Sequence, residues 1–283
     1  MPEMPEVETI ARKLRRSIAG KQIAGVYLSG KTLRRPMPRD FEVLLKGRTI
    51  RSIHRRGKYL ILEMEPHAFW LIHLGMSGRL VYGRKPAERS GHTHASVLFT
   101  DGGELQFRDP RRFGLMDFYQ TASLETLPDI QRLGKDPLGS EFDADWLWTE
   151  LKQTRRDLKS FLLDQRKIAG LGNIYVCEAM FRARVHPLRR CHTLTRCQAA
   201  ALTQAIREVL NAGIRNRGTS FSDFLDSDGE PGEHQHFLRV FQREGEKCRD
   251  CRATIARIRQ GNRSTYFCPH CQTGGPRSKG KRS

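Results

Sequence analysis

Two Cys-x-x-Cys pairs near the C-terminal end restrict the possible folds of this chain more than any other feature. They are Cys248 with Cys251 and Cys268 with Cys271, and sixteen residues lie between the pairs. Four thiolates at this spacing are typical of a closed tetrahedral zinc site. A module of about forty residues buries too little apolar surface to fold alone, so the metal would supply its folding free energy. We therefore predict one structural zinc ion; iron or a pair of disulfides are the alternatives.

A β-hairpin is predicted between the two cysteine pairs. Residues 254–258 and 264–267 read as short strands, and Arg259-Gln260-Gly261-Asn262 reads as the turn that joins them. Arg259 and Arg263 lie at this turn, where they would be able to face a phosphate backbone. The alternative is a zinc-stabilised module that carries solvated arginines with no nucleic-acid role.

The charge of the chain predicts a polyanionic partner. The 283 residues include 50 Lys and Arg against 31 Asp and Glu, for a formal net charge of +19. Nucleic acid is the leading candidate. A membrane surface is a weaker one, because no apolar run approaches the length of a spanning helix. Glu3, Glu6 and Glu8 argue against a secretory signal, and an odd number of cysteines favours a reducing compartment, so we expect a cytoplasmic protein.

The first half of the chain predicts one helix followed by strands. Val7, Ile10, Leu14 and Ile18 recur at helical spacing before Gly20. Short β-rich runs separated by turns then favour a sandwich or a barrel. The predicted strands are residues 49–53, 59–64, 69–74, 96–100 and 104–108.

The second half predicts a helical domain. Residues 146–163, 174–184 and 193–214 have helical periodicity, and residues 215–236 lose it. We expect a basic disordered tail after the zinc module. The predicted divisions are an N-terminal domain at 1–121, a linker at 122–140, a helical domain at 141–236 with a loop at 217–236, the zinc module at 237–273 and the tail at 274–283.

The start of the chain predicts an unusual nucleophile. Removal of Met1 would leave Pro2 with a free secondary amine. An α-amino group has a pKa of about 8, against about 10.4 for lysine, so about a tenth of it is unprotonated at pH 7. The positive end of the following helix would disfavour its protonation and favour the carboxylates of Glu3 and Glu6. The alternative is an ordinary proline at the start of a capped helix.

Two further stretches predict contacts with nucleic acid. In residues 168–175, Gly170 and Gly172 allow a tight turn, and Asn173 stands at the start of the next helix, where free N–H groups bind phosphate. A simple turn between helices is the alternative. Arg111 and Phe113 lie between a proline and a glycine, as in a wedge that enters a base stack.

Met76 and His73 are two further candidates for contact with nucleic acid. Met76 lies between two glycines, in residues 75–78, and His73 ends an apolar run. We predict that Met76 is a second apolar wedge residue and that His73 binds phosphate. For Met76 and Phe113 the alternative is a place in the core, and for His73 it is a core histidine with satisfied hydrogen bonds.

In this order, the motifs resemble those of formamidopyrimidine-DNA glycosylase, a bacterial family of base-excision enzymes. The resemblance covers almost the whole chain. It rests on MPEMPEVET at the start, RGKYL at 56–60, HLGMSG at 73–78, DPRRFG at 109–114, LLDQ to Tyr175, and FCPHCQ at 267–272. Met4 departs from the leucine that is usual in the family, and the tail after Gln272 is longer than expected.

The resemblance implies roles for these residues. Pro2 would form a Schiff base with the sugar of the damaged nucleotide, Glu3 would act as general acid and base, and Glu6 would position the terminus. Lys58 would belong to the catalytic group and would also grip phosphate. The residues implied in DNA binding are His73, Asn173 and Arg263 on phosphates, and Met76, Arg111 and Phe113 in the gap left by the flipped nucleotide.

The resemblance also implies a fold and a partner. The fold would be α+β: an N-terminal helix with a β-sandwich, a helix–two-turn–helix domain and a C-terminal β-hairpin zinc finger. The expected protein is a monomer that acts on double-stranded DNA containing oxidised purines, such as 8-oxoguanine and formamidopyrimidines, or abasic sites. The loop at 217–236 resembles the family's flap, which covers the extruded 8-oxoguanine. That loop and Phe113 favour this branch over its relatives of the endonuclease VIII type, which act on oxidised pyrimidines. A non-catalytic, zinc-dependent DNA-binding protein is the other alternative.

Overall fold

The chain forms two compact units in the computed structural model, which describes residues 2–221 and 224–274. The first unit contains the chain up to Arg132 together with Gly213–Gln235, and the second contains Leu133–Ala212 and the chain from His236 onward. Met1 and nearly all of the predicted tail lie outside the described residues. None of the helices in the described part of the chain has both the length and the apolar character needed to cross a bilayer.

The first unit begins with helix α1 (Met4–Ile18), as its periodicity predicts. Val7, Ile10, Leu14 and Ile18 are all buried on one face of this helix. Gly20 follows with a φ of +80°, a conformation that ends the helix and that a side chain would disfavour. The apolar face of α1 therefore holds the start of the chain against the core of this unit.

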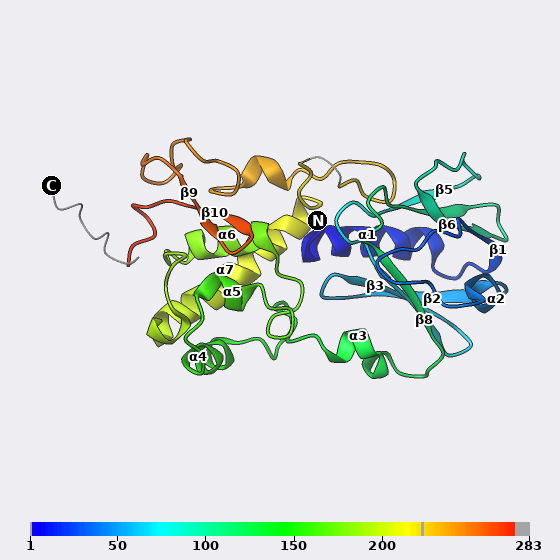
Figure 1. The fold of residues 1–283 in the computed structure, drawn as a ribbon, viewed down its shortest axis with the longest axis horizontal. Coiled ribbons are helices and arrows are strands. Elements are labelled where there is room, and N and C mark those ends of the chain that lie inside the picture. The colour runs from blue at the N-terminus through cyan, green and yellow to red at the C-terminus, as the bar shows by residue number, and fades with distance from the viewer. Residues whose placement is uncertain (1, 222–223, 275–283) are drawn as a thin grey trace. The chain divides into compact units, whose positions relative to one another are not determined.

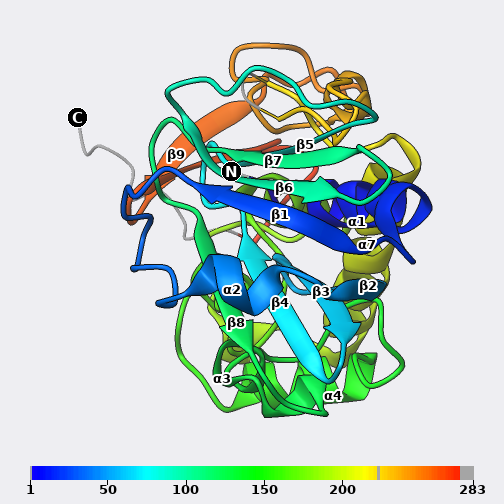
Figure 2. The same ribbon diagram turned by 90° about the vertical axis from the view of Figure 1, so that its right-hand side faces the viewer.

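Two four-stranded antiparallel sheets make up the rest of the core (Figure 2). One sheet has the order β1-β6-β7-β5 and the other the order β2-β3-β4-β8. This confirms the predicted sandwich. The strands are β1 (Ile23–Leu28), β2 (Thr49–Arg56), β3 (Tyr59–Glu65), β4 (Ala68–His73), β5 (Arg79–Gly83), β6 (Thr93–Phe99), β7 (Glu104–Arg108) and β8 (Leu115–Tyr119).

The inner faces of both sheets and the apolar face of α1 share one hydrophobic core. The short helix α2 (Phe41–Leu45) contributes Phe41, whose ring packs edge-on against Trp70 of β4 at a centroid distance of 5.9 Å. Two short helical segments, η1 (Leu124–Thr126) and α3 (Pro128–Gln131), follow β8. This rigid core carries the turns between strands that hold the predicted site residues.

The second unit is helical (Figure 1). One continuous helix over 146–163 was predicted, and this is wrong, because the chain breaks after Lys152. Asp157 begins a new helix by accepting a hydrogen bond from the N–H of Ser160 at 2.9 Å, a typical N-cap. The helical elements are α4 (Ala144–Lys152), α5 (Leu158–Leu162), α6 (Asn173–Arg182), η2 (Cys191–Thr193), α7 (Arg196–Arg215) and η3 (His234–Phe237). The last turn of α7 and the first two residues of η3 belong to the first unit.

The predicted hairpin of the cysteine module is present. Strands β9 (Ala256–Gln260) and β10 (Arg263–Phe267) pair antiparallel, with Arg263 opposite Gln260. The turn between them is Gly261 and Asn262, shorter than predicted, and Gly261 has a φ of +55°. This places Arg259 inside β9 and Arg263 at the first position of β10.

Candidate functional site

The start of the chain is buried and held by one carboxylate. Pro2 and Glu3 precede α1, and both are buried. Glu6, in the first turn of α1, accepts a hydrogen bond from the N–H of Glu3 at 2.8 Å through Oε2. Its other oxygen accepts the N–H of Thr219 at 2.7 Å. Glu6 therefore connects the segment that contains Pro2 to the loop predicted at 217–236.

Lys58 and His73, both predicted to bind phosphate, lie at the ends of neighbouring strands. Lys58 is buried in the turn between β2 and β3, and His73 ends β4, where it pairs with Tyr59 of β3. Burial, and then the charges of Lys58 and Arg34, lower the pKa of His73 to about 4. The imidazole is therefore neutral near pH 7.

The tautomer of His73 follows from its hydrogen bond. The N–H of Gly75 lies 3.0 Å from Nδ1 of His73, so Nδ1 accepts and the proton resides on Nε2. A neutral imidazole with a defined N–H is suited to donate a hydrogen bond to an anion. It adds no charge of its own to the site.

Met76 and Phe113 are surface residues, so the core alternative for both is wrong. Met76 is 40% exposed and Phe113 is 44% exposed. The guanidinium carbon of Arg111 lies 4.8 Å from the centre of the Phe113 ring, a cation–π contact. The two turns touch, because a Cβ added to Gly75 would lie 2.3 Å from the carbonyl carbon of Phe113. The structure thus places Met76, Arg111 and Phe113 on two turns whose backbones are in contact.

Asn173 and the hairpin meet within the second unit. Gly170 adopts a φ of +94°, and its N–H donates to the side chain of Gln165 at 2.8 Å. Asn173 is the first residue of α6, and its Nδ2 donates to the carbonyl of Ser264 at 3.0 Å. Arg263, exposed beside Ser264, is thereby held near the start of α6. The glycine-rich turn leads directly into the start of α6, where Asn173 lies.

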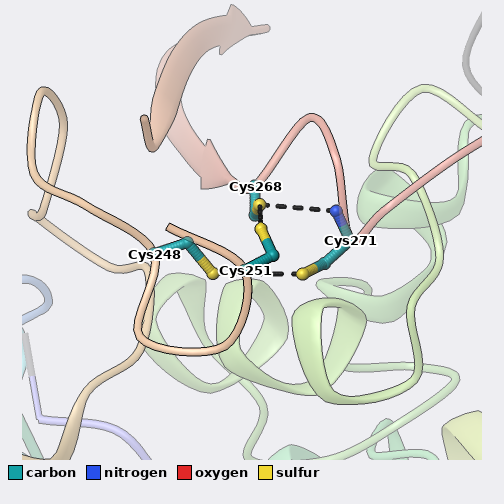
Figure 3. A group of neighbouring side chains, drawn as sticks. All are labelled: Cys248, Cys251, Cys268 and Cys271. Carbon is teal, nitrogen blue, oxygen red and sulfur yellow. Dashed lines mark hydrogen bonds between the residues drawn. The ribbon is translucent and has the colours of Figure 1, made fainter. Parts of the chain in front are cut away.

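The four predicted metal ligands converge on one point (Figure 3). All four sulfur atoms lie within 4.8 Å of one another. The Sγ atoms of Cys248 and Cys271 are 3.9 Å apart, and those of Cys251 and Cys268 are 3.4 Å apart. A tetrahedron with Zn–S bonds of about 2.3 Å places its sulfurs about 3.8 Å apart. The site therefore fits one zinc ion, and these separations are too long for the disulfide alternative.

Backbone N–H groups support this metal site. The N–H of Asp250 donates to Sγ of Cys248, and the N–H of Cys271 donates to Sγ of Cys268, both at 3.4 Å. Such bonds stabilise thiolates and orient them toward a metal. Ile255 and Phe241 pack with the buried cysteines in a small apolar cluster against α6. The zinc would hold together a module with little core of its own.

Sequence reasoning missed three buried polar residues that organise these segments. Asp109, between β7 and β8, accepts hydrogen bonds from Ser77 and Gly114. Lys159 of α5 donates to the Ser264 carbonyl at 2.9 Å and to Oγ1 of Thr265 at 2.6 Å. Glu178 of α6 accepts the N–H groups of residues 239–241, each at 2.9 Å. A charged residue on an otherwise apolar helix face is the only sequence signal that could have found Lys159 and Glu178.

Family models match three parts of the chain. The Formamidopyrimidine-DNA glycosylase N-terminal domain matches residues 1–116. The Formamidopyrimidine-DNA glycosylase H2TH domain matches residues 133–224. A zinc finger found in FPG and IleRS matches residues 245–274, which include all four cysteines.

Relatives that match over nearly their whole length are named Formamidopyrimidine-DNA glycosylase, like the first two family models. A Formamidopyrimidine-DNA glycosylase of Pelotomaculum thermopropionicum is 43% identical over 275 residues, covering 96% of this chain and 99% of the relative. One of Rhodospirillum centenum is 43% identical over 289 residues, covering 96% of this chain and 100% of the relative.

Solved structures agree with these matches. The crystal structure of the MutM (Fpg) protein from Thermus thermophilus has a TM-score of 0.86 at 38% identity, covering 97% of this chain and all of that one. MutM in complex with DNA containing carbocyclic 8-oxo-G has a TM-score of 0.88 at 33% identity, covering 96% of this chain and all of that one.

Proposed function

The chain belongs to the formamidopyrimidine-DNA glycosylase family, and from this premise we propose that it removes oxidised purines from double-stranded DNA and then cleaves the abasic site. The proposed substrates are 8-oxoguanine and formamidopyrimidines, the damaged bases that the expected branch of the family excises. One observation carries the proposal: Pro2 and Glu3 lie buried at the start of α1, held by Glu6. The predicted roles of the individual residues and the predicted domain boundaries are part of this proposal.

The proposed nucleophile is the secondary amine of Pro2, once Met1 has been removed. Its nitrogen bonds to C1′ of the damaged nucleotide, and the bond from C1′ to the base breaks. Glu3 moves the proton that opening of the sugar ring requires, first as an acid and then as a base. The product is an iminium ion that joins the enzyme to the sugar.

The same iminium ion makes strand cleavage possible. It acidifies the C2′ proton, so the 3′ phosphate leaves by β elimination, and the 5′ phosphate then leaves by δ elimination. Hydrolysis of the iminium releases the sugar fragment and regenerates Pro2. Lys58 is buried in the same unit as Pro2, and its positive charge would stabilise the phosphate groups that leave in these steps.

DNA binding rests on two further sets of residues. His73, Asn173 and Arg263, with Lys58, grip the phosphates, and the positive charge of the chain adds non-specific affinity. Met76, Arg111 and Phe113 fill the space of the extruded nucleotide, which is supported by the exposure of all three side chains and by the contact between Arg111 and Phe113. Zinc has a structural role, and its cysteines hold the hairpin that presents Arg263.

Borohydride trapping tests the chemistry. Incubation with duplex DNA containing 8-oxoguanine, followed by reduction, should yield one covalent adduct, and peptide mass spectrometry should locate it at Pro2. Pro2→Gly should weaken strand cleavage, and Glu3→Gln should abolish base excision while DNA is still bound. Binding without any adduct would support the non-catalytic alternative. Faster excision of an oxidised pyrimidine than of 8-oxoguanine would support the endonuclease VIII type.

A further inference from the structure

Asp109 is a fully buried carboxylate that lies between the two turns that carry Met76 and Phe113. Its Oδ1 accepts the hydroxyl of Ser77 at 2.6 Å and the N–H of Arg111 at 3.3 Å. Its Oδ2 accepts the N–H of Gly114 at 2.7 Å. No Lys or Arg forms an ion pair with it within the described part of the chain, so these donors alone compensate its burial.

The backbone of Asp109 is fixed on both sides. Its N–H donates to the carbonyl of His92 at 2.9 Å. Its own carbonyl lies 2.9 Å from Nε2 of His94, and because a carbonyl only accepts, Nε2 carries the proton. His94 is itself buried on β6. The carboxylate therefore projects from a rigid part of the sandwich.

The donors come from both turns. Ser77 belongs to residues 75–78, and Arg111 and Gly114 belong to residues 109–114. Gly75 touches the backbone of Phe113 so closely that no side chain fits there. A single charge thus connects the turn of Met76 to the turn of Phe113, while the tips of both remain exposed.

We propose that Asp109 is a positioning residue that holds Met76, Arg111 and Phe113 as one preformed wedge for opening the duplex at the lesion. The proposal rests on the proposed function, since it deepens the role of these three side chains. A wedge must be ordered when it replaces an unstacked base. If Asp109 orders the wedge before DNA binds, the entropy cost of ordering its side chains does not add to the free energy needed to break the base pair.

Asp109→Asn is the variant that tests the positioning role most directly. The side chain keeps its shape, but its amide nitrogen is a donor and faces the N–H of either Gly114 or Arg111, neither of which can accept. On the Arg111 side, the hydroxyl of Ser77 would also have to turn from donor to acceptor. Ser77→Ala removes only the connection between the two turns and leaves the bonds within residues 109–114. Glu104→Gln is the matched control, because Glu104 is also buried on this sheet and accepts from Ala87 at 2.9 Å and Gln106 at 2.8 Å, away from the wedge.

The test compares two duplexes in single-turnover assays with the full-length, zinc-loaded protein. One contains 8-oxoguanine opposite cytosine, which must be unpaired, and the other contains an abasic site, which has no base pair to break. Asp109→Asn should lower the rate on 8-oxoguanine about tenfold and abasic-site cleavage by less than about twofold. Ser77→Ala should lower the ratio of the 8-oxoguanine rate to the abasic-site rate in the same direction, by a smaller factor. Glu104→Gln should leave this ratio unchanged.

The outcomes separate the two proposals. A wild-type protein that cuts neither duplex contradicts the proposed function. An active wild type with an Asp109→Asn variant that loses both activities equally, or neither, overturns the positioning role. If thermal melting shows that Asp109→Asn does not fold, Ser77→Ala decides by the same ratio, and a wild-type ratio there overturns the proposal.

Discussion

Oε1 of Glu6 and the backbone nitrogen of Thr219 lie 2.7 Å apart, although 213 positions separate the two residues in the chain. The other oxygen of Glu6 accepts the N–H of Glu3. One carboxylate thus holds both the proposed general acid and the first residues of the loop proposed to cover the lesion. The geometry of that loop and the geometry of the reacting end of the chain depend on the same side chain.

Glu6→Gln should weaken both the fold and the reaction. An amide offers one acceptor oxygen, so either Glu3 or Thr219 loses its partner, and a buried unsatisfied N–H costs about 1–3 kcal/mol. We expect a lower urea midpoint and at least about tenfold slower excision of 8-oxoguanine, with DNA affinity changed by less than about twofold. Urea unfolding and single-turnover kinetics measure these effects. Wild-type values in both would contradict the shared anchor.

Gly218→Ala should reduce activity more than Gly229→Ala. The two glycines have φ values of +81° and +85°, so both variants carry a similar backbone strain of about 1–2 kcal/mol. Only the Cβ at Gly218 would approach Glu6, at 2.9 Å from its Cγ, whereas nothing lies within 4 Å at Gly229. Excision rates and melting temperatures of both variants decide the matter. Equal losses would mean that contact with Glu6 is unimportant.

Stability should fall as the pH drops from about 6.5 to about 4. Burial, with nearby charges, lowers the pKa of both His73 and His234 to about 4, below the value of about 6.5 in an unfolded chain. Between these values the unfolded chain binds more protons, so stability rises with pH across the window. His73→Gln and His234→Gln should each reduce this slope in urea titrations. Unchanged slopes in both variants would refute the assignment.

Removal of zinc should unfold the C-terminal module. Chelation should release one zinc ion per chain and reduce DNA affinity, because the hairpin that carries Arg263 loses its support. Cys268→Ser should act in the same way. Cys197→Ser, at an exposed cysteine outside the cluster, is the control and should keep its zinc. Elemental analysis and circular dichroism follow both effects, and a chain purified with iron would contradict the metal assignment.

DNA affinity should depend steeply on salt. If about five phosphates are neutralised, the slope of log affinity against log salt should be near −4 to −5. Arg263→Gln should reduce its magnitude by about 1. Arg257→Gln is the control on the same hairpin, since Arg257 pairs with Glu244 at 2.9 Å, and it should leave the slope unchanged. Fluorescence anisotropy at several salt concentrations measures each slope, and a flat response would refute the phosphate grip.

Local patterns alone predicted several elements well. The apolar spacing in α1, the strand at 104–108 and the cysteine spacing all depend on residues that are neighbours in sequence. The strands that were not predicted, β1, β5 and β8, are all edge strands. An edge strand is covered on fewer sides, so polar residues and glycine interrupt its alternation, as Arg79 does in β5 and Gly25 does in β1.

The sequence by itself determined the kinds of elements, the metal ligands and the family, because periodicity, spacing and motif order can be read along the chain. Only the tertiary structure decided which distant groups meet: Glu6 with Thr219, Asp109 with Ser77, and Lys159 with Ser264. A buried polar group must find a partner wherever the folded chain returns to it, and no local pattern states where that is. The exposure of Met76 and Phe113 was decided in the same way, since an apolar side chain suits a core and a wedge equally well until the packing around it is known.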